Sequence, residues 1–541
     1  MSASEKGHLA EDNTPGSDSR AVDQDRDTFL PRPSDDPNDP LNFPLWLKVR
    51  SLPNPQALDT EYHLQITILL QVCLLACIGT LNTAIINPAY GPLAKEFGIT
   101  TVRASYQTTV VIALNGVGPF LWIPLANVYG RRPVYLFTTL IGFASALGSA
   151  YSKNFAQLII ARVFNGIWPA ALGLGPATVV DLFFYHQRGR AMGLFTVILT
   201  TGAHIAPIVG GLIGQFLGWR WTFKFAAILD GVMLLIITFC LPETLYVRNQ
   251  SRLTRTISER EIAFTPKTYI SRLRLYSTFP ELKLRWNQFV IPPLKMARYP
   301  SVLFPALYYG AQYGFASILP AVTVASIFSK AFHWNTLEIG LAYGGALSVG
   351  GILGEIAAGM VLDNIVKRAR RNLGGANPPP EIRLKAIWTG ALLLPVGLLI
   401  YGFTLQYHVF WFVPLFGMGL ACFGLQVITT TCYTYSIDSY RAESSETAQL
   451  FNLIRQEFGM TFAFYVVDLC NKIGYQWAFF MFAVLGSGLG FIPIVVLMFK
   501  GEQIRNKLGA PRNLNALDAD VVREVELDKL GEEKTVHQEA S

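Results

Sequence analysis

Charged residues are scarce in this sequence of 541 residues: Asp, Glu, Lys and Arg make up 15% of it, against 51% hydrophobic residues. The six cysteines lie in or beside apolar runs and lack the spacing of metal ligands, which argues against a disulfide scaffold and a metal site. The formal net charge is +7, but the basic residues are scattered over the gaps between apolar runs. We therefore expect no nucleic-acid partner, no metal and no cofactor.

Motifs for energy coupling and catalysis are also missing. The sequence has no GxxxxGK[ST] loop, which argues against an ATP-driven pump, and no HExxH or GxSxG motif, which argues against a membrane hydrolase. No loop has the character of an ion-channel filter. We therefore expect that the protein is not an enzyme.

Both ends of the chain lack long apolar runs. Residues 1–60 are polar, acidic and interrupted by proline, without the apolar core of a cleavable signal peptide, and predict a disordered tail. Residues 500–541 predict a second polar tail, in which VVREVELDKLGEEK favours a short surface helix.

Long apolar runs fill the rest of the chain. A helix needs roughly 20 residues to cross a bilayer, and about twelve runs are long enough. They lie near residues 64–86, 105–126, 134–151, 156–180, 191–213, 222–242, 300–327, 337–361, 385–405, 409–434, 447–469 and 477–499. We predict an all-α integral membrane protein with twelve transmembrane helices, surrounded by the lipid bilayer.

A polar, basic segment, residues 244–298, divides the chain into an N-terminal half, residues 61–243, and a C-terminal half, residues 299–499. The stretch LANVYGRRPVY after the second apolar run is echoed by GMVLDNIVKRARR after the eighth. This weak repeat predicts two pseudo-symmetric six-helix halves, as in secondary transporters with a central cavity. Basic residues gather in alternate loops, and they are Arg131, Arg132, Arg188, Arg190, Lys367, Arg368, Arg370 and Arg371. Because loops rich in Arg and Lys stay in the cytoplasm, this pattern predicts that both termini are cytoplasmic.

Several motifs follow one another in a recognisable order. DPNDPLNFPLWLK precedes the first helix, LANVYGRRPVY follows the second, ARVFNGIWPAA lies in the fourth, GAHIAPIVGG lies in the fifth, GWRWTF and LPETL flank the sixth, and DSY follows the tenth. Together they resemble the major facilitator superfamily, and more narrowly the fungal relatives of its twelve-helix drug:proton antiporters. The resemblance covers about residues 36–500 and implies the fold of that superfamily.

The loop motif of that family usually has an acid where this chain has Asn127 and a glycine where it has Ile123. The helix-five motif usually has a glycine where this chain has Ala206. The resemblance assigns conformational roles to Asn127, Gly130, Arg131, Arg132, Gly202, Pro207, Gly210, Gly211 and the second-half counterpart Asp363. An acid at position 127 would cap a helix and pair with basic residues. We therefore expect Asn127→Asp to strengthen the contact that closes the cytoplasmic side, and Asp363→Asn to be the more damaging change.

Helix five places small residues four apart, at Gly202, Ala206, Gly210 and Gly214, beside Pro207. Such a face lets a partner helix approach closely, and we interpret it as the flexing seam between the halves. Ordinary packing of small residues is the alternative.

Ionisable residues inside apolar runs are costly and therefore suggest function. Asp230 lies in the middle of helix six without a neighbouring cation in sequence, so it could carry a coupled proton or pair with a cationic solute. The resemblance implies that Arg162, in helix four, modulates that site. His204, in helix five, is a further candidate because imidazole titrates near neutral pH. Structural roles for all of them, with hydrogen bonds to neighbouring helices, are the alternatives.

Polar and aromatic residues on apolar helices are the candidates for binding the solute: Asn82, Asn87, Tyr308, Tyr309, Gln312, Tyr313, Glu355, Arg455 and Gln456. Glu355 and Arg455 could form an ion pair. Aromatic walls with few fixed charges favour an amphipathic or cationic compound. Alternatively, the tyrosines belong to the aromatic belt at the membrane surface.

These observations predict a secondary transporter that works by alternating access. The helix-five motif favours proton-coupled efflux of a drug, toxin or secondary metabolite. Proton-coupled uptake of a small organic cation such as a polyamine is the alternative, followed by a non-transporting sensor. We expect a monomer in the plasma membrane, with the vacuolar membrane as the alternative site.

Overall fold

The computed structural model describes residues 64–183, 185–245, 273, 286–372, 378–440 and 443–509. The predicted N-terminal tail, most of the basic central segment and most of the C-terminal tail lie outside these residues. Throughout the described part the regular structure is helical. The N-terminal half comprises α2 (Leu64–Ala84), η5 (Asn87–Ala89), α3 (Tyr90–Phe97), α4 (Thr101–Tyr129), α5 (Arg131–Ala150), α6 (Phe155–Ile167), α7 (Ala171–Leu182), α8 (Tyr185–Phe216) and α9 (Trp219–Cys240).

The C-terminal half begins after a short helix, α12 (Trp286–Lys295), and the turn η7 (Met296–Arg298). It comprises α13 (Pro300–Tyr313), η8 (Gly314–Ile318), α14 (Leu319–Ala331), α15 (Thr336–Asn372), η9 (Pro380–Ala386), α16 (Ile387–Gln406), α17 (Phe412–Ser439), α18 (Ser444–Ile473), α19 (Tyr475–Met481), η11 (Phe482–Gly488), η12 (Leu489–Phe491) and α20 (Ile492–Leu508). The last helix continues past Lys500, where the sequence predicts the start of the tail.

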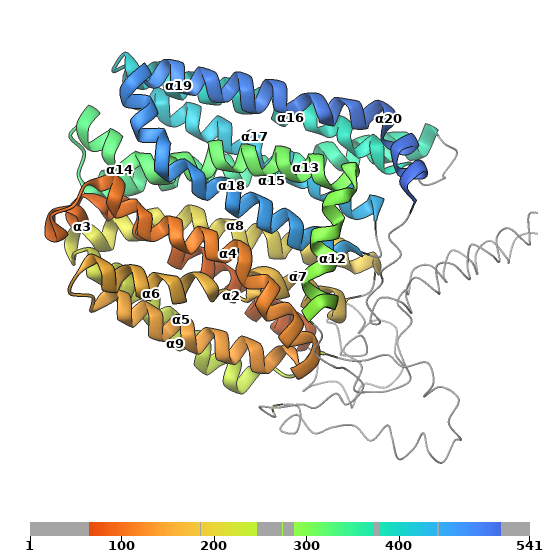
Figure 1. Cartoon of the computed structure of the whole chain (residues 1–541), viewed down its shortest axis with the longest axis horizontal. Helices are drawn as coiled ribbons and strands as arrows, with labels where there is room; N and C mark the ends of the chain where they lie inside the picture. Colours follow the sequence, from red (N-terminus) through yellow and green to blue (C-terminus); the bar gives the residue numbers. More distant parts are fainter. Residues whose placement is uncertain are drawn as a thin grey trace, which may run out of the picture.

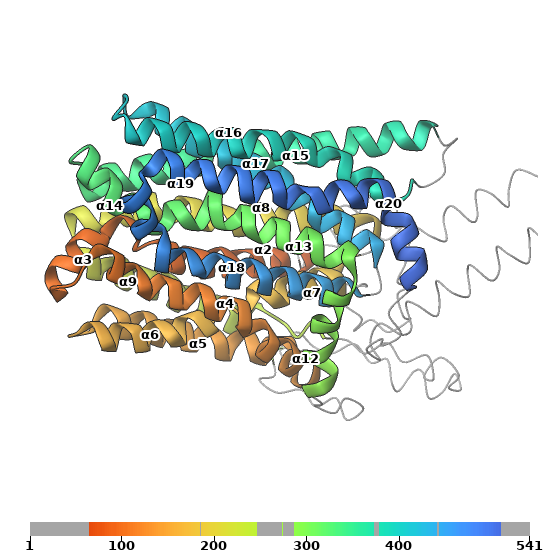
Figure 2. The ribbon, with the colours of Figure 1, turned by 45° about the horizontal axis from the view of Figure 1, so that its top comes forward.

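The long helices run side by side, with the N-terminal half on one side of the bundle and the C-terminal half on the other (Figures 1 and 2). Eleven spans in the described residues are long and apolar enough to cross a membrane. The remaining predicted span, residues 447–469, lies in α18, which runs along the same bundle but carries Arg455, Glu457 and Asp468. Because α18 packs against α4 and α13, much of it is shielded by protein, and it can carry more polar residues than a lipid-facing helix.

Several spanning helices are interrupted. Trp168 leaves helical geometry between α6 and α7, immediately before Pro169, and the space for Pro169 is made by Gly79 of α2, where any Cβ would overlap the proline ring. The π-helical segments η8 and η11 interrupt two spans of the C-terminal half. Gln312 joins them, because its amide donates to the Gly486 carbonyl (3.1 Å) and accepts from the Ser487 hydroxyl (2.7 Å). Interruptions of this kind are frequent at functional sites.

The two halves meet along α8 and α15, where backbones touch. A Cβ at Gly340 would lie 2.7 Å from the Gly211 Cα, and a Cβ at Gly344 would lie 3.0 Å from the His204 carbonyl oxygen. We call this contact, made by Pro207 and Gly211 with Gly340 and Gly344, the α8–α15 seam.

The small residues predicted to form the seam mostly face another way. Gly202 packs against Cys77 of α2, Gly210 packs against Ile85 just after α2, and Ala206 is fully buried in the cluster around Ile85. Gly214 alone also reaches the other half, at Thr336. The prediction is therefore wrong about the face: the stripe of small residues holds the N-terminal half together, and the next face round the helix meets α15.

Two features close the ends of the bundle. At the end with Trp219, the GWRWTF motif ties α9 to its neighbours: Glu96 accepts from the Trp219 indole (2.7 Å) and pairs with Arg220, which also donates to the Ser152 carbonyl (3.0 Å). At the opposite end, α12 runs across the ends of the other helices and contacts α4 of one half and α18 of the other (Figure 1). The predicted basic loop therefore ends in a helix that spans both halves.

Candidate functional site

Asp230 is the most buried carboxylate in the described part of the chain, with no exposed surface. It lies on α9, and its Oδ2 accepts a hydrogen bond from the Asn82 amide on α2 (2.9 Å). Its Oδ1 and the Asn82 Oδ1 face no protein donor. A carboxylate placed among apolar helices with one free oxygen is suited to take up and release a proton.

Arg162 approaches the same asparagine from the other side. Its guanidinium donates to the main-chain oxygens of Asn82 (3.0 Å) and Thr83 (3.2 Å) and to Asn165 (2.9 Å), and lies 5.2 Å from the Phe223 ring centre. Arg162 and Asp230 therefore meet through Asn82 without a direct ion pair. The structure brings together two of the three residues predicted for proton coupling.

The third, His204, lies elsewhere. Its Nε2 is 3.9 Å from the Cys422 sulfur of α17, and its ring fills the space next to Gly351 of α15. His204 is thus part of the contact between the halves, beside the α8–α15 seam.

A line of polar groups continues from Asn82 into the C-terminal half. The Asn115 amide donates to the Thr83 hydroxyl (3.4 Å), and the Asn452 amide donates to the Asn115 carbonyl (3.0 Å). Gly116 permits this close approach of α4 and α18, since a Cβ there would lie 3.0 Å from the Gln456 side chain. We call the set Asp230, Asn82, Arg162, Thr83, Asn115, Asn452 and Arg455 the polar chain.

Arg455 is the last member of the polar chain. Its guanidinium donates to Asn452 (2.9 Å) and to the Tyr309 hydroxyl (3.4 Å), and lies 4.7 Å from the Tyr313 ring centre. The predicted pair with Glu355 is absent, because Arg455 turns toward α13, whereas Glu355 lies within reach of Thr430 on α17.

Other predicted solute-binding residues have different surroundings. Tyr308 packs on Phe491 inside the C-terminal half, and both ends of the Gln312 amide are bonded there. Asn87 accepts from the Tyr90 hydroxyl (2.8 Å) and lies within reach of Tyr343 of the other half. The structure therefore groups Tyr309, Tyr313 and Arg455 and separates them from Tyr308, Gln312, Asn87 and Glu355. Gln456 faces Gly116 of α4.

The loop motif forms a compact cluster at the end of the bundle opposite Trp219. Gly130 has a positive φ of 102°, and a Cβ there would overlap Glu243 of the LPETL motif. Glu243 accepts the backbone N–H groups of Arg131 (2.8 Å) and Arg132 (3.2 Å), and the Arg131 side chain pairs with Asp181 (2.6 Å). We call these residues the Glu243 clasp.

The acidic residues that make bonds at this end of the bundle are not at the two positions, 127 and 363, that the sequence motif indicates. No side-chain bond of Asn127 appears in the described structure, and the α5 N-terminus is held by Glu243. Asp363 is exposed on α15 and has no ion pair among the described residues. In the second half Asp438 pairs with Arg383 (2.5 Å), and Glu381 with Arg505 (3.3 Å).

Sequence reasoning missed Thr83, Asn115, Asn165, Asn452 and Glu243. The spacing of Asn452 and Arg455 was an available signal, because residues three apart share a helix face. Asn115 and Thr83 had no such signal, since single polar residues in apolar runs usually bond within their own helix.

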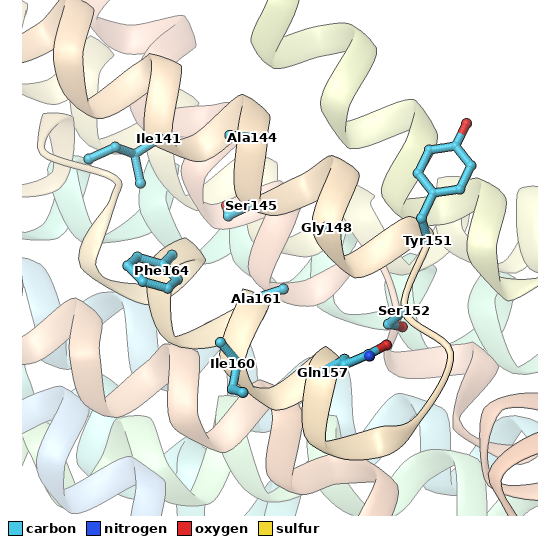
Figure 3. Close-up of a pocket in the computed structure, with 10 residues that line it drawn as sticks. All are labelled: Ile141, Ala144, Ser145, Gly148, Tyr151, Ser152, Gln157, Ile160, Ala161 and Phe164. Carbon is cyan, nitrogen blue, oxygen red and sulfur yellow. The ribbon is translucent and has the colours of Figure 1, made fainter.

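A groove between α5 and α6 lies on the outer surface of the bundle (Figure 3). Ala144, Ser145 and Gly148 line it beside the exposed Ile160 and Phe164. Its apolar rim faces the surroundings of the bundle, so lipid chains are its expected contacts. It includes none of the predicted site residues, and the polar chain lies inside the bundle.

Comparison with known proteins agrees with this architecture. The family model described as Major Facilitator Superfamily matches residues 72–464. The chain is 30% identical to "Efflux pump FUBT" of Fusarium oxysporum over 80% of this chain and 73% of that protein. It is 30% identical to "MFS transporter fsa7" of a Fusarium species (85% and 84% covered), and 29% identical to "Cycloheximide resistance protein" of Candida maltosa (76% and 71%).

Solved structures share the fold at low sequence identity. A D-xylose-proton symporter aligns with a TM-score of 0.55 at 16% identity, covering 83% of this chain and 98% of that one. The xylose transporter XylE from E. coli, in a partially occluded inward-open conformation, aligns with a TM-score of 0.54 at 15% identity, covering 80% and 97%. The protein is a multi-pass membrane transporter and not an enzyme, and it belongs to the Major Facilitator Superfamily.

Proposed function

We propose that this transporter exports a small organic solute and that Asp230 carries the proton exchanged for it. The observation that carries this proposal is the polar chain, which joins a buried carboxylate with a free oxygen to Arg455 in the opposite half. Because alternating access moves one half against the other, protonation of Asp230 can change bonds that hold the halves together.

Export is favoured over uptake by the names of relatives, which include efflux pumps and a resistance protein. We further propose that the Glu243 clasp faces the cytoplasm, since the basic loops lie at that end. Both termini are then cytoplasmic. We also propose a monomer in the plasma membrane, as expected from the sequence.

The test compares metabolite extracts of cells with and without this chain, at two external pH values. We expect at least one compound to be depleted from cells expressing the chain, more strongly at acidic external pH. Asp230→Asn should abolish the pH-dependent part of the depletion and preserve solute exchange at equal pH. Asp468→Asn, which alters an exposed carboxylate, is the matched control and should change neither.

Two outcomes would overturn the proposal. Accumulation of a compound inside the cells would indicate uptake. If depletion in Asp230→Asn still depends on external pH, Asp230 does not carry the coupled proton.

A further inference from the structure

Arg455 has only neutral partners. Its bonds go to the Asn452 amide oxygen and the Tyr309 hydroxyl, its cationic face rests against Tyr313, and its Nε lacks a protein acceptor. Among the residues that the structure describes, no carboxylate lies within ion-pair distance of Arg455. A guanidinium held among packed membrane helices without a counter-charge is costly, so its retention calls for a partner from outside the chain.

Charges on the surrounding helices do not supply that partner. Glu457, on the same helix, faces Gly116 of α4, and Glu355 of α15 lies against Thr430. Asp230 is separated from Arg455 by the length of the polar chain, and Asn82 links it to Arg162. The polar chain thus holds two guanidinium groups and one carboxylate, an excess of positive charge.

The neighbourhood of Arg455 is aromatic. Tyr309 lies 5.6 Å from Tyr433 and 6.2 Å from Phe451, measured between ring centres, and Tyr433 lies 4.6 Å from Phe451. Flat aromatic side chains suit the apolar body of a solute, and a guanidinium whose Nε–H lacks an acceptor suits a carboxylate, which a guanidinium can bind through two parallel hydrogen bonds.

We propose that the exported solute is an amphipathic organic acid whose carboxylate binds Arg455 beside Tyr309 and Tyr313. This inference rests on the proposed export function and names its substrate class. It keeps the amphipathic solute expected from the sequence and drops the cationic alternative, because a cation would meet a surplus of positive charge. Loss of the bidentate contact should remove most of the preference for an acid.

The experiment uses three probes with one aromatic body: 1-naphthylacetate, its methyl ester and 1-naphthylmethylamine. Binding to the purified full-length protein is measured by thermal stabilisation, and export by flux from proteoliposomes under a pH gradient. We expect the wild type to prefer the acid over the ester and the amine by about tenfold or more. Arg455→Gln should reduce this preference to near parity.

Arg455→Lys keeps the charge but loses the planar fork, so it should retain a weaker preference for the acid. Arg368→Gln removes an exposed arginine of α15 and is the matched control, expected to behave as wild type. Should Arg455→Gln fail to fold, the comparison of wild type with Arg455→Lys still decides the question.

Equal or stronger binding of the ester or amine by the wild type would overturn the inference, as would an acid preference that persists in Arg455→Gln. Failure of the proposed function has a different result. Acid binding that depends on Arg455, without any flux that depends on Asp230, would refute proton-coupled export and leave the anion site standing. Flux of the amine that depends on Asp230 would refute the anion site and leave proton-coupled export standing.

Discussion

Glu243 lies just beyond the end of α9 and accepts four backbone N–H groups, those of Arg131, Arg132, Thr244 and Leu245. Two of these begin α5, whose N-terminal donors would otherwise lack partners. A single carboxylate thus fastens the α5 N-terminus to the end of α9. The family motif directs attention to an acid at position 127, but in the structure the acid that accepts the N–H groups at the start of α5 is Glu243.

We expect Glu243→Ala to lower the free energy of unfolding by about 2 to 3 kcal/mol, because a charged acceptor is lost from several buried donors. Glu243→Gln should cost less, since the amide oxygen can keep the bonds on one side. Thermal unfolding in detergent measures both. Glu502→Ala, at an exposed position of α20, is the control, and an equally large loss there would contradict the expectation.

The same residue predicts a dependence on pH. Burial raises the pKa of Glu243 above its usual 4.5, and the N–H groups of Leu245, Arg131 and Arg132 oppose this rise only in part. Because the folded protein then holds the proton more tightly than the unfolded chain, the stabilisation is complete below the usual pKa and is lost as pH rises through the raised one. The melting temperature of wild type relative to Glu243→Gln should therefore increase from about pH 7 to about pH 5. A difference in melting temperature between the two proteins that does not change with pH would contradict the raised pKa of Glu243.

Among the elements, α8 carries two different interfaces on adjacent faces. Gly202, Ala206 and Gly210 pack on α2 and the residue after it, Ile85, while Pro207 and Gly211 form the α8–α15 seam. The sequence predicts the small residues of α8 and their close packing. It does not predict which face meets which helix, because lipid and neighbouring helices are equally apolar and the pattern lacks a polar side.

The α8–α15 seam can be tested with a pair of glycines on α15. A Cβ at Gly340 would lie 2.5 Å from the Pro207 carbonyl oxygen, whereas nothing lies within 4 Å of a Cβ at Gly345. We expect Gly340→Ala to destabilise this closed contact by about 1 to 3 kcal/mol and Gly345→Ala to have no such cost. Thermal unfolding and labelling of a cysteine placed beside the seam would measure this. Equal behaviour of the two variants would contradict the close contact.

At the scale of the molecule, the two halves hold corresponding helix starts by different bonds. In the N-terminal half an acid after the sixth span, Glu243, holds the start of α5. In the C-terminal half a base near the end of α20, Arg505, pairs with Glu381 at the start of η9. The internal repeat predicts corresponding loops. The structure adds that a carboxylate with backbone donors holds this place in one half and a side-chain ion pair holds it in the other.

The Arg505–Glu381 ion pair predicts the behaviour of a charge swap. Arg505→Glu alone should lower stability, because two carboxylates then face each other in a partly buried place, by about 1 to 2 kcal/mol. Adding Glu381→Arg should recover part of the loss. The double-mutant cycle is read from melting temperatures, and strictly additive effects would show that the pair does not interact.

Much of the architecture follows from the sequence, since apolar length defines the spans and the central segment separates the halves. Asp230 and Arg162, predicted to act together, both bond to Asn82, and their joint role in proton coupling stays a prediction. The continuation through Asn115 to Asn452 could not be predicted, because it depends on how α4 and α18 approach at Gly116. His204 was grouped with Asp230 on chemistry alone, and the chain geometry places it against α15 and α17 instead.

Asn452 donates to the main-chain oxygen of Asn115, so only one of the two residues contributes a side chain to this bond between the halves. Every residue has a main-chain oxygen, whatever its side chain. As far as this bond is concerned, position 115 is free to drift in evolution, whereas nearly any change at position 452 removes it in one step. The two halves therefore carry unequal mutational risk at the point where they are joined.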